Sequence, residues 1–173
     1  MLFHNTPTGN LGDLFKSTFQ SAYSILSKNI KLLSLKNNLG HELYAFLFTQ
    51  TLFYMSQKKK KIREQALNDL YTVCDSFFAY LNNSYFQKRF DFYKSRCFDG
   101  FIRNDWFLSK YPNQPDIRLF IVFGDCLYNS DCVTDYDDAP ISTRSVFEQM
   151  EYNKMMLKIQ EILQEYCKSV GKL

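Results

Sequence analysis

The sequence predicts an all-α protein, a single-domain bundle of five to six helices with an irregular acidic loop near residues 128–144. Residues 41–99 contain neither glycine nor proline, so nothing in this stretch breaks a helix strongly. Apolar residues recur every three to four positions in most segments, which is the helical period. Only residues 117–123 have a strand-like composition. A lone strand has nothing to pair with, so we expect a helix there too.

A chain of 173 residues, of which 46% are hydrophobic and 23% charged, has the size and composition of one globular domain. We expect residues 1–10 to form a loose leader and residues 11–173 a single helical domain. A first helix is predicted from about Leu11 to Lys36, because its apolar residues form one stripe. The turn at residues 37–40 contains asparagine and glycine, which end helices readily.

A second helix is predicted over residues 41–57 and should be central, because it is apolar on most faces. The next apolar stripe covers residues 62–81. One rod spanning both segments would be about 60 Å long, whereas a domain of this size is about 40 Å across. No apolar residue occurs between Met55 and Ile62, so the sequence predicts a break at residues 56–59.

Later boundaries have capping signals. Ser84 and Gln87 fit a capping box, with Ser84 as the N-cap of a helix that continues toward Gly100. Residues 100–114 are expected to be irregular. Ser145 and Glu148 fit a second capping box, followed by a long helix with a heptad-like apolar seam. That seam predicts packing inside the bundle, and a homodimer through residues 145–170 is the alternative.

The basic corner consists of Lys58, Lys59, Lys60, Lys61 and Arg63. Cations stabilise a helix C-terminus and disfavour an N-terminus, so we expect the lysines at the end of the second helix. The alternative is a binding site for nucleic-acid phosphate or another anion. Residues 1–65 carry nine basic and three acidic side chains. This excess of positive charge is compatible with both the helix-end role and the anion-binding role of the lysines.

The segment 85–111 interleaves aromatic and basic residues, a composition that also suits single-stranded nucleic acid. Phe86, Phe90 and Tyr93 have helical core spacing, so we predict core packing for them. No known RNA- or DNA-binding motif accompanies them.

The acidic loop carries Asp131, Asp135, Asp137 and Asp138. Clustered carboxylates can hold a hard cation, but the segment lacks the glycine and the final glutamate that an EF-hand loop requires. We therefore expect no metal, and interpret the loop as a solvated turn region or a docking site for a partner.

Catalytic and cofactor motifs are absent from the sequence. It contains only two histidines, His4 and His41, and no P-loop, dinucleotide fingerprint or serine elbow. Neither Cys126 nor Cys132 has an evident histidine base. The five cysteines lack zinc-site or C-x-x-C spacing, so no cofactor is expected.

Together these patterns predict a cytoplasmic, non-catalytic binding protein of the adaptor, inhibitor or immunity kind. Its partner is expected to be another protein, met by the acidic loop and the basic corner. The first alternative is a nucleic-acid-binding helical protein that uses residues 58–63, and the second is a small helical enzyme. No segment has the length and hydrophobicity of a membrane span, and no signal peptide is expected.

Overall fold

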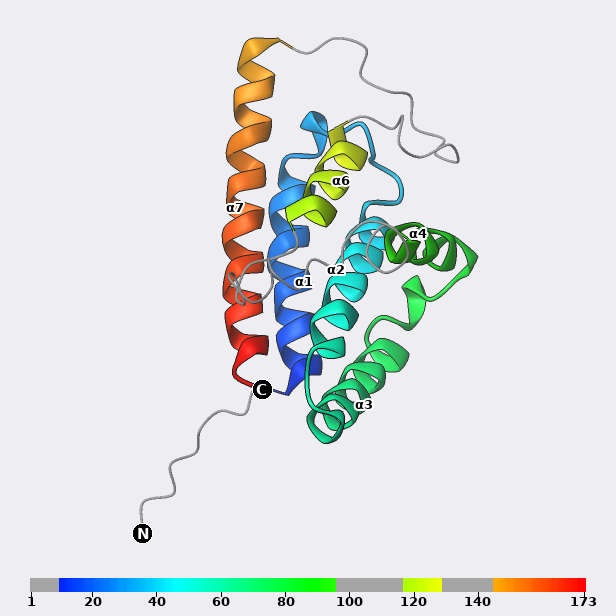
Figure 1. The fold of residues 1–173 in the computed structure, drawn as a ribbon. Coiled ribbons are helices and arrows are strands. Elements are labelled where there is room, and N and C mark those ends of the chain that lie inside the picture. Colours follow the sequence, from blue (N-terminus) through cyan, green and yellow to red (C-terminus); the bar gives the residue numbers. More distant parts are fainter. Residues whose placement is uncertain (1–9, 96–116, 129–144) are drawn as a thin grey trace.

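All regular structure in the described part of the chain is helical (Figure 1). The structure, a computed structural model, describes residues 10–95, 117–128 and 145–173. Its α-helices are α1 (Leu11–Lys28), α2 (Leu39–Ser56), α3 (Lys60–Ser76), α4 (Ser84–Lys94), α6 (Ile117–Tyr128) and α7 (Val146–Gly171), and two short 3₁₀ turns are η1 (Ile30–Leu32) and η2 (Ala79–Leu81). The predicted all-α class is confirmed, and residues 117–123 are helical. The predicted irregular region 100–114 lies outside the described residues, as does most of the predicted leader.

Helix α1 lies between α7 and α2, and these three helices run side by side (Figure 1). Helix α3 packs on α1, and α4 packs on α2. The buried side of α1 is a stripe with helical spacing, as predicted from the sequence; its members are Leu11, Phe15, Phe19, Ala22 and Leu26. Because α1 contacts helices from both ends of the chain, it organises the core.

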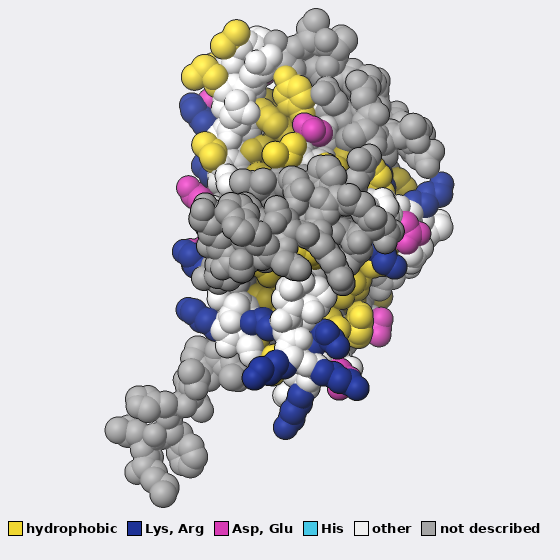
Figure 2. All heavy atoms as spheres, viewed as in Figure 1, with side chains coloured by type: hydrophobic (Ala, Val, Ile, Leu, Met, Phe, Trp, Pro, Cys, Tyr) yellow, Lys and Arg dark blue, Asp and Glu magenta, His cyan; other side chains and the backbone are white. Residues whose placement is uncertain are grey.

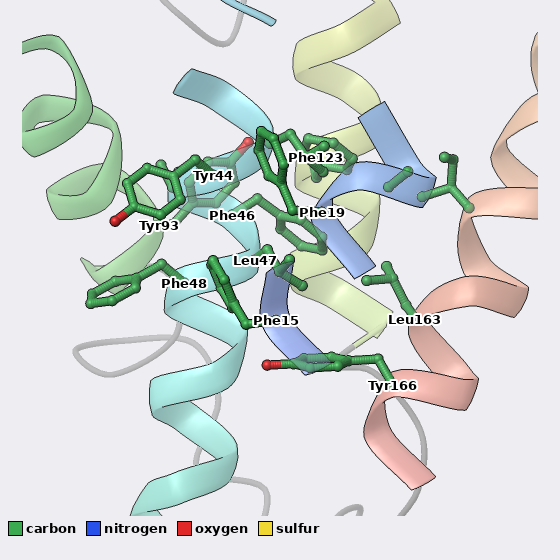
Figure 3. Close-up of a cluster of buried hydrophobic side chains, with 14 of the residues drawn as sticks. Phe15, Phe19, Tyr44, Phe46, Leu47, Phe48, Tyr93, Phe123, Leu163 and Tyr166 are labelled. Carbon is green, nitrogen blue, oxygen red and sulfur yellow. The ribbon is translucent and has the colours of Figure 1, made fainter. Parts of the chain in front are cut away.

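Helix α2 is the central helix of the core, as its all-round apolar sequence predicts. One side carries Phe46, whose ring stacks on Phe123 of α6 with centroids 4.2 Å apart. Another side carries Tyr44, which stacks on Phe78 at 4.9 Å. The close-up in Figure 3 shows these aromatic side chains gathered around α2, with Phe15 reaching in from α1. Burial on most sides leaves α2 little surface for a ligand.

The first helix ends at Lys28, eight residues before the predicted end. The Asn29 side-chain amide donates to the Ile25 carbonyl oxygen at 2.8 Å and so caps the helix C-terminus. Farther on, the Ser34 backbone N–H donates to the carbonyl oxygen of Leu127, at the end of α6, at 2.9 Å. The predicted helix end was wrong because the chain leaves the helical path after Asn29. The Ser34 backbone then bonds to α6 instead of continuing the helix.

The predicted break in the chain is confirmed, since α2 ends at Ser56 and α3 starts at Lys60. The predicted place of the lysines is only partly right. Lys60 and Lys61 form the first turn of α3, where the helix dipole disfavours them. The unfavourable interaction with the helix dipole costs about 0.3–1 kcal/mol per exposed charge. Helix α3 forms despite this cost and packs against α1. Lys60 also lies 3.8 Å from Glu64 in an i,i+4 ion pair.

Cap residues locate the remaining boundaries. Asn83, not the predicted Ser84, caps α4, because its side-chain oxygen accepts the Phe86 backbone N–H at 3.0 Å. The prediction was wrong by one residue because both asparagine and serine are good N-caps. Ser145 caps α7 as predicted and accepts from the Glu148 N–H at 3.1 Å.

Candidate functional site

The residues of the basic corner lie between α2 and α3 and in the first turn of α3. Lys59, Lys60 and Lys61 are exposed, whereas Lys58 and Arg63 are half-buried. Lys58 donates from Nζ to the Gly171 carbonyl oxygen at 2.9 Å, so it satisfies the C-terminus of α7 rather than that of α2. Figure 2 shows basic side chains gathered at this end of the molecule. The corner therefore combines a structural tie through Lys58 with an exposed group of three lysines.

The acidic loop residues Asp131, Asp135, Asp137 and Asp138 lie outside the described residues, as do His4, Cys97 and Cys132. The docking role of the loop stays a prediction. Among residues 10–95, 117–128 and 145–173, no group of three or more histidine, cysteine or acidic side chains is placed to hold a metal ion. Within that part of the chain, no helix is long and apolar enough to cross a membrane.

A buried polar cluster joins α2, α4 and α6, and the sequence analysis missed it. Arg89 of α4 donates from Nε to Oε2 of Glu42 at 2.7 Å and from Nη2 to Oε1 at 2.9 Å. The Tyr93 hydroxyl also donates to Glu42 Oε1. Arg89 Nη2 lies 3.6 Å from Sγ of Cys126 on α6. The signal available in the sequence was Glu42 itself, a lone acid in the first turn of an otherwise apolar helix.

The electrostatics of this cluster fit a structural role. Burial alone would lower the pKa of the Arg89 guanidinium, but hydrogen bonds and charge pairing with Glu42 hold that pKa above its ordinary value. Burial and the Glu42 carboxylate both raise the pKa of Tyr93, so its hydroxyl keeps the proton that it donates. All three side chains are buried, so a substrate in solvent does not reach them. The cluster fixes α4 against α2.

The cysteines and His41 do not form a catalytic pair among the described residues. Cys74 and Cys167 are buried, and burial raises the pKa of Cys74 to about 11 and that of Cys167 to about 12. Such thiols are poor nucleophiles near neutral pH. His41 Nε2 lies 3.0 Å from Nδ2 of Asn83, and burial lowers the pKa of His41.

The predicted core role of the aromatic residues after Tyr85 is confirmed for those that are described. Tyr93 is buried. Phe86 and Phe90 stack on each other at 5.9 Å, and both rings meet Phe48 of α2. These faces are therefore occupied by protein, which removes them as stacking platforms for bases.

Gln50 of α2 is a buried amide with no hydrogen-bond partner for either side-chain atom in the described structure. Burying an unpaired amide costs about 1–3 kcal/mol. We therefore expect Gln50→Leu to raise the free energy of unfolding by about 1–2 kcal/mol, measured by urea denaturation. The neighbouring Thr51→Val is the control. The Thr51 hydroxyl lies 2.6 Å from the Tyr166 hydroxyl, so its removal should destabilise the protein. A loss of stability in Gln50→Leu would contradict an unpaired amide.

Four exposed apolar side chains lie on α7. The outer apolar surface consists of Val146, Phe147, Met150 and Leu157, whose side chains are 74%, 70%, 52% and 58% exposed. These residues lie opposite the predicted apolar seam of α7, which packs inside the bundle. Figure 2 shows hydrophobic side chains spaced apart along the N-terminal half of α7. In the sequence, these four residues are recognisable as apolar residues of the last helix that do not belong to its buried seam.

A groove of about 390 Å³ lies beside this surface, between α6 and α7. Its apolar floor includes Tyr152 and Met156, and polar residues at its edges include Asp125, Gln149 and Asn153. Tyr152 donates its hydroxyl to the Gly124 carbonyl oxygen at 2.5 Å, which holds α6 against α7. The outer apolar surface of α7 and the groove between α6 and α7 are therefore two candidate contact features that share this helix.

Comparison with known protein families, with curated proteins and with solved structures found no match to this chain.

Proposed function

We propose that this protein is a non-catalytic protein-binding module whose contact region is the outer apolar surface of α7 and the adjoining groove. The observation that carries the proposal is the exposure of Phe147, a large aromatic side chain that is 70% exposed beside three other exposed apolar residues. Large apolar side chains exposed on one side of a helix suit burial in a protein interface. Aromatic and methionine side chains are also enriched at such interfaces.

Two features of the fold favour this region over the interior as the functional one. The buried polar cluster is closed to solvent and has a structural role. The core around α2 is filled by aromatic side chains. Among the described residues it leaves no room for a ligand there, so we place the binding site on the surface. This assignment keeps the predicted class of function and moves its contact site to α6 and α7.

The second candidate is anion or nucleic-acid binding by the basic corner. The observation that favours it is the exposure of Lys59, Lys60 and Lys61 on one end of the fold, where Lys60 has only a distant ion pair at 3.8 Å. Three exposed lysines suit contacts to phosphates without base readout.

Photo-crosslinking in cells of the native host separates the two candidates. We expect benzoylphenylalanine at position 147 to give a discrete protein adduct that Leu157→Glu abolishes. The same amino acid at position 80, where Tyr80 is 68% exposed on η2, is the matched control and should give no such adduct. Equal labelling at both positions, or none at position 147, would overturn the proposed function. A nuclease-sensitive adduct at position 61 would support the second candidate.

A further inference from the structure

Helix α7 presents a second seam of residues on its outward side. Val146, Met150, Asn153 and Leu157 follow one another at intervals of four, three and four, which is the spacing of a and d positions in a coiled coil. All four side chains are exposed. The inner side of the same helix, which includes Ile159 and is packed in the core, takes no part in this seam.

The outer seam is complementary to itself when two α7 helices run antiparallel. A two-fold axis between residues 151 and 152 places Val146 opposite Leu157 of the second copy, and Met150 opposite Asn153. Phe147 and Lys154 each follow a seam residue, so the same register brings Phe147 of one copy beside Lys154 of the other. A lysine ammonium over an aromatic face contributes about 0.5–1 kcal/mol at an exposed site. Every apolar side chain of the outer surface then has a neighbour.

Charge selects the antiparallel direction. Lys58 is tied to Gly171 at the C-terminal end of α7, so the basic corner lies at that end of the helix. A parallel pair would bring two basic corners side by side, and like charges repel. In the antiparallel register the two ends are about 60 Å apart along the helix axis. Opposed helix dipoles favour the same arrangement.

We infer that the occupant of the outer apolar surface is a second copy of this chain, joined through antiparallel α7 helices. This inference rests on the proposed function and names its partner. The seam is short, about 17 Å from Val146 to Leu157. The area is therefore at the small end for a specific interface, and the dimer is expected to be concentration-dependent.

Sedimentation velocity on the full chain tests the association. The mass should rise with concentration from 20.5 kDa toward twice that value. Leu157→Glu should hold the protein at the monomer mass at every concentration, while Tyr80→Glu, the matched exposed control, should leave the association unchanged. Unchanged far-ultraviolet circular dichroism should show that both variants fold.

The register of the two α7 helices is tested by measuring the distance between spin labels on the two copies, by pulsed electron paramagnetic resonance. Spin labels attached through a ketone-bearing amino acid, at position 161 or 168, leave the cysteines untouched. The antiparallel register predicts axial separations of about 28 Å and about 50 Å, whereas a parallel pair gives about 10 Å at both positions. Parallel distances, a monomer at all concentrations, or a dimer that survives Leu157→Glu would overturn the inference. In the monomer case, an adduct with a different protein at position 147 would leave the proposed function standing.

Discussion

We expect Arg89→Met to lower the free energy of unfolding by about 3–5 kcal/mol. The substitution keeps much of the buried side-chain volume but removes the guanidinium that pairs with the Glu42 carboxylate at 2.7 and 2.9 Å. Glu42 is fully buried, so its carboxylate would lose the bidentate contact with the guanidinium without gaining access to water. Methionine also abolishes the contact of the guanidinium with the Phe92 ring, at 4.1 Å from its centroid.

Urea denaturation followed by circular dichroism measures this effect, and two further variants isolate its cause. Glu42→Leu combined with Arg89→Met removes both charges and should be clearly more stable than Arg89→Met alone. Lys168→Met breaks an ion pair with Glu165 that has the same 2.7 Å distance but is exposed. We expect no measurable change there, because solvent screens the pair. Equal losses in the buried and exposed variants would contradict a role for burial.

Gly12→Ala is expected to destabilise the protein by about 2–3 kcal/mol. A methyl group at Gly12 would lie 2.5 Å from Cγ2 of Val73 and 2.7 Å from the backbone oxygen of Asp69. The valine can turn away, but the backbone of α3 cannot yield without moving the helix. Gly12 therefore sets how closely α1 approaches α3, and alanine there must push the two helices apart.

Gly40→Ala is the matched control for this prediction. The nearest atoms to an added methyl at Gly40 are 3.7 Å away, an ordinary contact, and alanine is the better helix former. We expect an unchanged or slightly higher thermal midpoint for Gly40→Ala. Adding Val73→Ala to Gly12→Ala should restore only part of the loss, because the Asp69 oxygen remains. Equal midpoints for the two glycine variants would refute the close approach of α1 and α3.

The sequence was enough to predict the fold class and most helices, because apolar periodicity records which face of a helix is buried. The break between α2 and α3 followed from the apolar gap before Ile62, and the start of α7 followed from the Ser145 capping box. Helix ends that depend on a contact with a distant residue could not be predicted from the sequence. After the Asn29 cap of α1, the Ser34 backbone bonds to Leu127 of α6, a distant partner that local spacing cannot reveal.

The candidate site was harder to predict for a related reason. The lysine run and the acidic loop stand out as local composition, so the sequence predicts both as contact sites, and those roles stay predictions. The pairing of Glu42 with Arg89 spans 47 positions, and neither residue alone indicates it. The outer apolar surface was recognisable only after the buried side of α7 was known, because the same helix carries apolar residues on both sides.

The neighbouring positions of α1 and α7 bear on how the chain folds during synthesis. Helix α1 packs against α7, although α7 begins more than a hundred residues later than α1 ends. At a translation rate of about 5–20 residues per second, that interval lasts several seconds or more. The α7-facing side of α1 stays uncovered on the ribosome throughout. The native packing of α1 against α7 can therefore form only after the last helix has been synthesised.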